Sequence, residues 1–350
     1  MSTTVTTMRF PITSLLSVVA CSPLRLRVRA ATVVGVTLML AATACGSTST
    51  SIVFTSDRDG NLELYSFHVR DQTEKNLTNS QTDEFSARLS PNKRMVSFLS
   101  GTEGATALEV VRIDGTERAA MTQSGAARST QRWSPNGDRL AFAESRGTTT
   151  GIYMATIEGA IVALLTTVHG DEVGDWSRDG DRVAFAVRGG PDEGIYVRNP
   201  DGVNEFRVTN NPDYSPIWSP DSSKLAFISQ RDGNPEVYVM DSDGGNVKRL
   251  TETDAPEYDI SWSPDGQKIV FVSERDDNAE IYVTARDGTS QDRLTFNTTV
   301  DNQPVWSPSG NQIAFVSYLD GDADIFVMAS DGKNQKRVTN NDAEDTQPTW

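Results

Sequence analysis

The stretch ISWSPDGQKIVFVSERDDNAEIY, residues 260–282, decides the fold. It contains an apolar run ending at Trp262, a second run at 269–272 and a third at 281–283. Ser-Pro-Asp-Gly separates the first two runs, and a polar turn around Asp276 and Asp277 separates the last two. In Ser-Pro-Asp-Gly, proline presets φ, aspartate bonds its own backbone and glycine adopts a positive φ. The stretch therefore predicts short strands joined by hairpins, not helices.

This stretch recurs along the chain with a nearly constant period. The six tryptophans are 43, 42, 44, 44 and 44 residues apart, and Leu89 lies 44 residues before the first. These residues form the Trp column: Leu89, Trp133, Trp176, Trp218, Trp262, Trp306 and Trp350. A phenylalanine follows each of the first six members after nine residues, and Phe54 heads this second column: Phe54, Phe98, Phe142, Phe185, Phe227, Phe271 and Phe315. Periods of about 40–45 residues with four strands per unit are typical of propeller blades.

The order of the strands predicts how the ring closes. The Trp-column strand is expected to be innermost, followed by the Phe strand, an Ile-Tyr strand and an outer Arg-Leu-Thr strand. The repeat region starts at Ile52 with a second strand, and it reaches Trp350 in a first strand. We therefore predict an all-β, seven-bladed propeller of four-stranded blades over residues 52–350. Its N-terminal strands pair with the C-terminal strand, which leaves no free edge.

The charge of the chain is strongly acidic. The formal net charge is −16, and the first 45 residues hold four arginines and no acid. Residues 46–350 therefore carry 28 basic and 48 acidic residues. Such a domain should repel nucleic acid and anionic lipid, and it would suit a cationic partner or metal ions. Solubility is the simpler explanation of the charge.

The first 45 residues have the pattern of a targeting segment. Three arginines at 25–29 precede an apolar run from Ala30 to Ala41, which is too short to span a bilayer comfortably. Ala-Thr-Ala-Cys45 and a polar tether, residues 46–51, follow. This site resembles a bacterial lipobox, which implies a lipid on Cys45 and an extracytoplasmic, membrane-anchored protein in the periplasm or at the cell surface. Val-Val-Ala-Cys21 is a weaker alternative, and a plain signal peptide or an uncleaved anchor is another.

The repeats resemble the WD40-like PD40 repeats of TolB-type propellers. The residues that carry the resemblance are Pro216–Asp221, Lys224–Ser229, Arg231–Met240, Asp243-Gly244 and Arg249–Thr251. The resemblance covers essentially all of 52–350, and it implies a propeller that binds a protein or peptide partner. Two departures indicate a TolB-like lipoprotein and not TolB: the family pattern has six blades plus an N-terminal α/β domain, whereas here we count seven, and only six residues separate Cys45 from Ile52.

An acid column lies five positions before the Trp column. Its seven positions are occupied by Glu84, Arg128, Asp171, Asp213, Glu257, Asp301 and Asp345. Because these residues precede the innermost strand, we expect the six carboxylates to ring one mouth of the central channel. They would bind a basic peptide, a basic loop or a cation there. The alternative is that each carboxylate caps the turn before its own blade.

Other candidate sites carry weaker signals. The turns Asp59–Glu63, Asp232–Glu236, Asp276–Glu280 and Asp320–Asp324 place oxygen ligands at alternate positions, as in a Ca²⁺ loop, but the EF-hand pattern is absent. Hairpin chemistry explains the same residues, so we expect no cofactor. The Trp column is expected to pack between blades and not to bind ligand. His68 and His169 lie far apart in the repeat, and we expect both to be lone surface residues.

We therefore predict a monomeric, non-enzymatic binding propeller. Oligogalacturonate lyases have similar repeats, but their metal site resembles a histidine cluster, which two scattered histidines do not provide. Prolyl-oligopeptidase-type propellers resemble this one but carry a Gly-x-Ser-x-Gly hydrolase domain, and that motif is absent here. The alternative to a protein partner is a carbohydrate-binding or carbohydrate-active propeller, because paired carboxylates also suit glycosidase chemistry.

Anchoring gives the first testable prediction. Cys45→Ser is expected to leave the protein without lipid, and either unprocessed or soluble, because lipid transfer needs the thiol. Mass spectrometry of the mature N-terminus measures this. An unmodified mature N-terminus at any residue other than Cys45 in the wild-type protein would contradict it.

Overall fold

A computed structural model describes residues 51–350, apart from 103, 124, 147–148, 159–160, 165 and 167–171. The described residues belong to a compact unit, Ser47–Trp350. The predicted leader with Cys21 and Cys45, and most of the tether, lie outside them. Within the described part of the chain, no helix is long and apolar enough to cross a membrane.

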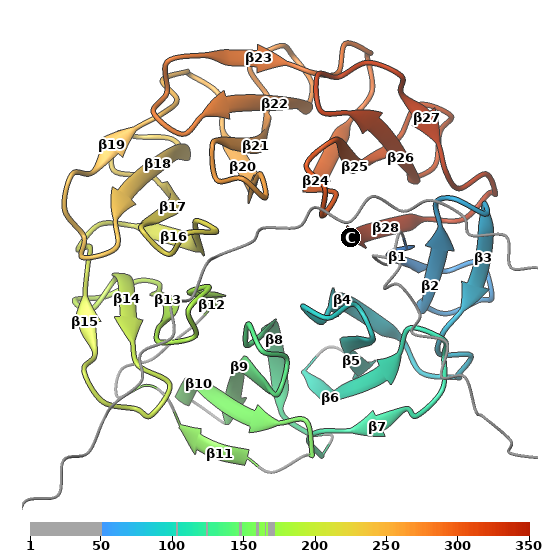
Figure 1. Ribbon diagram of the computed structural model, residues 1–350, viewed down its shortest axis with the longest axis horizontal. Coiled ribbons are helices and arrows are strands. Elements are labelled where there is room, and N and C mark those ends of the chain that lie inside the picture. The colour runs from blue at the N-terminus through green and yellow to red at the C-terminus, as the bar shows by residue number, and fades with distance from the viewer. Residues whose placement is uncertain are drawn as a thin grey trace, which may run out of the picture. The chain divides into compact units, whose positions relative to one another are not determined.

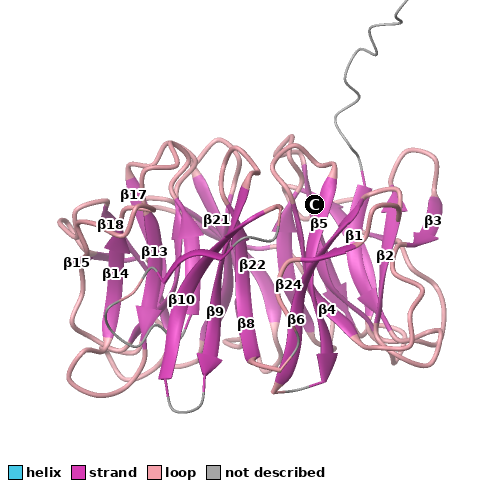
Figure 2. Ribbon diagram, turned by 90° about the horizontal axis from the view of Figure 1, so that it is seen from below, coloured by secondary structure: helices cyan, strands magenta, loops and turns pink. Residues whose placement is uncertain are grey.

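The described residues form seven four-stranded antiparallel sheets arranged as blades around a central axis (Figure 1). Seen from the side, the strands run roughly along the ring axis and the connecting turns lie at its two faces (Figure 2). The predicted all-β, seven-bladed propeller is therefore confirmed. We number the blades along the chain, so that blade 1 contains β1–β3 and blade 2 contains β4–β7.

Each blade uses its strands in the same order from the centre outward. The innermost strands are β4 (Glu84–Leu89), β8 (Ala127–Trp133), β12 (Glu172–Trp176), β16 (Asp213–Trp218), β20 (Glu257–Trp262), β24 (Asp301–Trp306) and β28 (Asp345–Thr349). The second strands are β1 (Ser51–Ser56), β5 (Met95–Thr102), β9 (Arg139–Arg146), β13 (Val183–Val187), β17 (Lys224–Ser229), β21 (Lys268–Ser273) and β25 (Gln312–Ser317). The third strands are β2 (Glu63–His68), β6 (Ala105–Arg112), β10 (Thr149–Thr156), β14 (Gly194–Arg198), β18 (Glu236–Asp241), β22 (Glu280–Ala285) and β26 (Asp324–Ala329). The outer strands are β3 (Thr73–Asn76), β7 (Ala119–Ala120), β11 (Ile161–Leu164), β15 (Phe206–Arg207), β19 (Lys248–Arg249), β23 (Gln291–Arg293) and β27 (Lys336–Arg337).

Blade 1 is closed by the two ends of the repeat region, as predicted. Its strand order is β28-β1-β2-β3. Strand β28 pairs antiparallel with β1, with Val53 opposite Thr349 and Ser56 opposite Asp345. Since the first and last strands share one sheet, the ring has no open seam at which another chain could pair.

The phenylalanine column forms the centre of each blade. All seven phenylalanines are at most 1% exposed. In five blades the ring stacks on a tyrosine of the third strand, such as Phe185 on Tyr196 with centroids 5.4 Å apart. These pairs combine burial of large apolar area with a favourable aromatic geometry.

The tryptophans join neighbouring blades. They are only 4–8% exposed, and Trp262 packs in one cluster with Val237 and Val239 of the preceding blade. The Trp262 indole Nε1–H also donates to the Ile217 carbonyl of that blade at 3.2 Å, and Trp133 does the same to Arg88 at 3.0 Å. The prediction that this column packs between blades is confirmed.

Closure of the ring gives the second prediction. Deleting residues 346–350 removes most of β28 and one buried tryptophan, and it exposes the edge of β1 and the apolar face of blade 7 on which Trp350 packs. Truncation of a buried Trp alone costs about 3–5 kcal/mol, so the melting temperature should fall markedly. Phe271→Ala, inside a blade, should cost a comparable amount. Thermal unfolding followed by circular dichroism measures both, and an unchanged melting temperature of the deletion would contradict the closure.

Candidate functional site

The acid column is buried between blades. Glu84, Glu257, Asp301 and Asp345 are 0% exposed and Asp213 is 1% exposed, each at the first residue of its innermost strand. Asp171 lies outside the described residues. At the remaining position, Arg128 forms an ion pair with Glu144 of β9 at 2.8 Å. Among the described members of the column, none lines a hollow on the ring axis.

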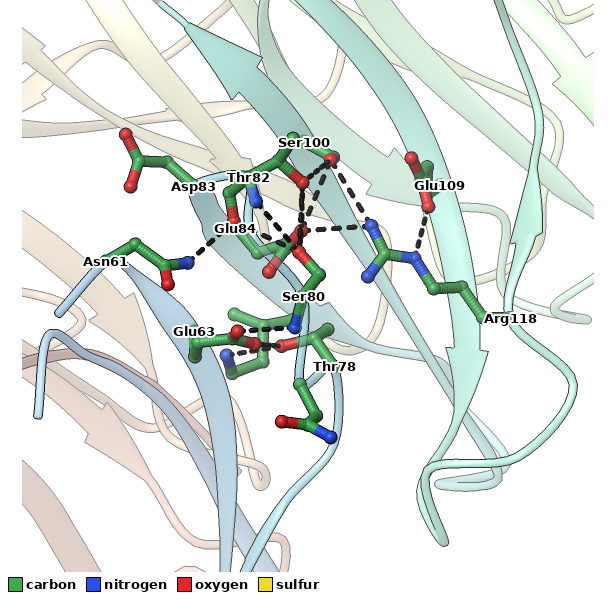
Figure 3. Close-up of polar contacts among 12 residues, drawn as sticks. Asn61, Glu63, Thr78, Ser80, Thr82, Asp83, Glu84, Ser100, Glu109 and Arg118 are labelled. Atoms are coloured by element: carbon green, nitrogen blue, oxygen red, sulfur yellow. Dashed lines mark hydrogen bonds and ion pairs between the residues drawn. The ribbon is translucent and has the colours of Figure 1, made fainter. Parts of the chain in front are cut away.

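Figure 3 shows how one of these carboxylates is held at the seam between blades 1 and 2. Glu84 Oε1 accepts hydrogen bonds from the hydroxyls of Ser80 at 2.6 Å and Thr82 at 2.7 Å. The Arg118 guanidinium donates to the same oxygen at 2.9 Å. Glu63 of blade 1 accepts from the Ser80 backbone N–H at 2.5 Å, so the loop between the blades is fastened from both sides.

Other seams repeat this pattern. Glu257 accepts from Thr253, four residues earlier, and from Arg275, both at 2.9 Å. Asp345 accepts from Asn341, again four residues earlier, at 2.7 Å, and from Arg58 at 2.9 Å. The structure therefore differs from the expected open ring of carboxylates. These groups fasten the loop that enters each blade, because the preceding blade covers the start of the innermost strand and removes it from solvent.

Several seams bury two carboxyl groups together. Glu236 of β18 and Glu257 of β20 are both 0% exposed, and each has one carboxylate oxygen without a hydrogen-bond donor in the described structure. Burial, and then the hydrogen bond with Glu236, raise the pKa of Glu257 to about 7. Burial likewise raises the pKa of Asp301 to about 6. Such a pair holds a proton that each carboxyl would lose in water.

The acidic turns between the second and third strands also have structural partners. Asn234 Nδ2 donates to the Ala255 carbonyl of the loop leading to the next blade at 2.8 Å, and Asn61 does the same to Thr82 at 2.8 Å. The Tyr65 and Tyr238 hydroxyls bond to Asp59 and Asp232 of these turns. In the described part of the chain, no group of three or more His, Cys, Asp or Glu residues is placed to hold a metal ion.

His68 belongs to no potential metal-binding group among the described residues. His68 Nδ1 lies 2.9 Å from Asp71 in a half-exposed surface pair. His169 lies outside the described residues.

The channel wall is built by a bulge in each innermost strand. The residue three positions before the Trp column has a positive φ in six blades: Ser86, Thr130, Ser215, Asp259, Gln303 and Gln347. Side chains at this position bond to the next blade, since Gln347 accepts from the Ser86 N–H at 2.7 Å and Gln303 accepts from the Gln347 N–H at 2.6 Å. Five of the six positive-φ residues, all except Thr130, line a mid-channel hollow of about 440 Å³. The bonds around the ring hold its wall in place.

A second and larger hollow opens at the face that carries the Ser-Pro-Asp-Gly turns. This mouth cavity has a volume of about 620 Å³ and is lined by all seven members of the Trp column. Its rim contains the residues two positions after members of the Trp column: Pro91, Pro135, Arg178, Pro220, Pro264 and Pro308. Because every blade contributes to it, the cavity lies on the ring axis.

The charges of the mouth cavity come from three blades. Arg88 and Lys93 of blade 2, Arg132 of blade 3 and Arg178 of blade 4 line it, together with one carboxylate, Asp175. Burial raises the pKa of Asp175 to about 6, and the Arg132 charge opposes this shift. Arg88 and Arg132 line the mid-channel hollow as well. The wall of the cavity is therefore cationic in a protein whose net charge is −16.

Our sequence reasoning missed these residues, although the repeat holds a signal. The position before the Trp column is occupied by Arg88, Arg132, Asp175, Ile217, Ser261, Val305 and Thr349. Only the first three are charged, and only the third copy, in blade 4, replaces the rim proline, with Arg178. The positions at which single copies depart from the repeat thus lie in the mouth cavity, whereas the described residues of the acid column, which most copies share, do not.

The buried carboxyl pairs give the third prediction. Folded Glu257 keeps its proton up to about pH 7, whereas the unfolded chain loses it near the ordinary value of 4.5. The folded state therefore binds more protons in this window, and stability falls as the pH rises through it. Glu257→Gln should remove this loss. Its stability relative to wild type should improve between pH 5 and 8 by on the order of 1–3 kcal/mol.

Urea unfolding at several pH values measures this difference. Glu252→Gln is the matched control, because Glu252 is exposed in the loop before the same strand. Parallel stability profiles for Glu257→Gln and wild type would contradict the prediction.

Comparisons with known proteins agree with this geometry. The family model described as TolB beta propeller domain matches residues 24–212, 107–260, 175–318 and 255–350. No curated protein matches the chain in sequence. A solved structure of a putative TolB from Agrobacterium tumefaciens is 26% identical, with a TM-score of 0.56, over 68% of this chain and 90% of that one.

Two further structures share the fold at lower identity. TolB from Acinetobacter baumannii is 18% identical with a TM-score of 0.57, over 86% of this chain and 82% of that one. An oligogalacturonate lyase in complex with manganese is 17% identical with a TM-score of 0.66, over 80% of this chain and 86% of that one. The fold thus occurs in TolB proteins and in an enzyme, so the fold alone assigns no activity. On the family match along the whole ring, this chain belongs to the TolB β-propeller family.

Proposed function

We propose that this protein is an extracytoplasmic, membrane-anchored binding module that binds a protein or peptide partner at the mouth cavity. The observation that carries the proposal is the cavity itself, a concave site on the ring axis to which all seven blades contribute. Concave sites with apolar walls and a few charged groups are the usual binding sites of folded domains.

The walls of this cavity suit binding. The rim prolines stand on turns with fixed geometry: Ser263 Oγ donates to Asp265 Oδ1 at 2.6 Å, and the Gly266 N–H donates to the Ser263 carbonyl at 2.8 Å. Pro264 and Pro308 are exposed, so they are available to a partner. A rim that is ordered before binding costs little conformational entropy when a partner docks.

The location is proposed from the leader. A basic and apolar segment that ends at Ala-Thr-Ala-Cys45 supports export and a lipid anchor. A tether of six residues at 46–51 would leave the propeller close to the membrane. The acidic surface supports a soluble domain that avoids nucleic acid and anionic lipid.

The fourth prediction tests the binding site. Residues 46–350 contain the whole closed ring and serve as a soluble bait for an envelope protein extract. Pro264→Trp/Pro308→Trp fills the rim with bulk, and it should abolish capture of any protein that docks in the cavity. Affinity capture with cross-linking and mass spectrometry measures the loss and locates the contact.

Pro191→Trp is the matched control, because Pro191 is exposed in the turn between β13 and β14, on the opposite face of the ring. Equal capture by both variants would contradict the proposed site. Binding to a glycan array, in place of protein capture, would favour a carbohydrate ligand over a protein partner.

A further inference from the structure

We propose that the mouth cavity recognises carboxylate groups, which an acidic segment of the partner supplies. This inference rests on the proposed function and gives the ligand a chemical class. The sequence suggested a basic partner, whereas this inference gives the partner an acidic segment. The cations that would bind the carboxylates are Arg88, Lys93, Arg132 and Arg178, which line the same hollow.

None of these four cations forms a direct ion pair with an Asp or Glu side chain among the described residues, although the charges of Asp259 and Asp175 act on Arg88 and Arg132 from a distance. Arg88 and Arg132 donate only to the backbone carbonyls of Ala87 and Gln131, at 2.9 and 3.0 Å. Lys93 donates to the main-chain oxygen of Trp350, the last residue of the sequence, at 2.5 Å.

Arginines elsewhere in the ring show the contrast. Arg231 bonds to Asp213 at 2.7 Å, Arg249 to Glu236 at 2.7 Å and Arg293 to Glu280 at 2.7 Å. In each case the carboxylate is fully or almost fully buried. The four channel cations lack such a direct ion pair, so their side chains are available to bind an external anion.

The cations are also held close enough to disfavour one another. Burial, and then the charge of Arg178, lower the pKa of Lys93 to about 8. Burial, and then the charge of Arg132, lower the pKa of Arg88, and the charge of Asp259 opposes this shift only in part. An anion placed among these groups would relieve their repulsion and replace part of their lost hydration, which favours binding of a negative ligand.

The chemistry of the walls selects a carboxylate on an extended chain. Arginine presents a planar fork that matches the two oxygens of a carboxylate. Arg88 and Arg132 line both hollows, whereas Lys93 and Arg178 line the mouth cavity and not the mid-channel hollow. The mid-channel hollow is also lined by the carboxylates Glu172 and Asp259, so the excess of cations lies in the mouth cavity, where an entering chain arrives first. The proline rim contacts the uncharged parts of that chain.

The variant Asp175→Asn separates a change of charge from a loss of folding, because misfolding would weaken binding whereas this variant should strengthen it. Asp175 is the single carboxylate among the described residues that line the mouth cavity, and its Oδ1 accepts the Trp176 N–H at 2.8 Å. Asparagine keeps that acceptor and removes the negative charge. Asp175→Asn should therefore bind an acidic ligand more tightly than wild type.

The experiment uses residues 46–350 and a dye-labelled hexaglutamate peptide, with binding measured by fluorescence anisotropy at about 50 and 300 mM salt. We expect binding of hexaglutamate, weakened by salt, and no binding of hexaglutamine or hexalysine. Arg132→Gln/Arg178→Gln should weaken binding roughly tenfold or more, and Asp175→Asn should strengthen it about two- to fivefold. Lys333→Gln/Lys336→Gln, which removes two exposed charges from blade 7, should leave binding unchanged.

Circular dichroism melts establish that each variant is folded, and Arg178→Gln alone, at an exposed side chain, should still weaken binding if the double variant is unstable. Equal weakening by the mouth pair and the blade 7 pair would overturn the inference. An unchanged affinity of Asp175→Asn would also overturn it.

Tighter binding of a hexauronate than of hexaglutamate would show that the carboxylates come from a sugar chain and not from a peptide. If the rim variant Pro264→Trp/Pro308→Trp loses its partner while Arg132→Gln/Arg178→Gln keeps it, the proposed function stands and this inference fails.

Discussion

Packing of each innermost strand against the blade before it is the constraint on which the whole molecule depends. A single four-stranded blade cannot bury both of its faces, so its stability comes from its two neighbours. Here the tryptophan covers the preceding blade and hydrogen-bonds to it, as Trp262 does to the Ile217 carbonyl. The same contact recurs around the ring, and β28 in blade 1 extends it across the point where the chain ends meet.

This constraint also determines which polar groups are buried. The first residue of each innermost strand lies inside a seam, so a carboxylate there needs donors from its own loop and an arginine nearby. Glu84 with Ser80, Thr82 and Arg118 meets this requirement. Where two carboxyls share a seam, as Glu236 and Glu257 do, burial raises the pKa of one of them to about 7, and the seam becomes sensitive to pH.

A repeat that is constrained everywhere leaves few places for a specific function. In the ring wall, the position before the Trp column lines the channel in every blade. This position varies from Arg88 and Arg132 to Ile217 and Val305 without a change of fold. The charged residues that line the mouth cavity belong to blades 2, 3 and 4. The mouth cavity therefore has one cationic side in an otherwise acidic molecule. This asymmetry is a general way for a symmetric scaffold to acquire a directional binding site.

The sequence by itself determined the strands, their order, the number of blades and the closure of the ring. These features follow from local turn chemistry and from a period that repeats seven times, and both are visible without tertiary contacts. The burial of Glu257 and Asp345 was decided only by the tertiary structure, because a loop carboxylate is exposed or buried according to how the neighbouring blade covers it. Only the tertiary structure also brought Arg88, Arg132 and Arg178 to one cavity, since they lie about 45 residues apart in the chain and meet when the blades close around the axis.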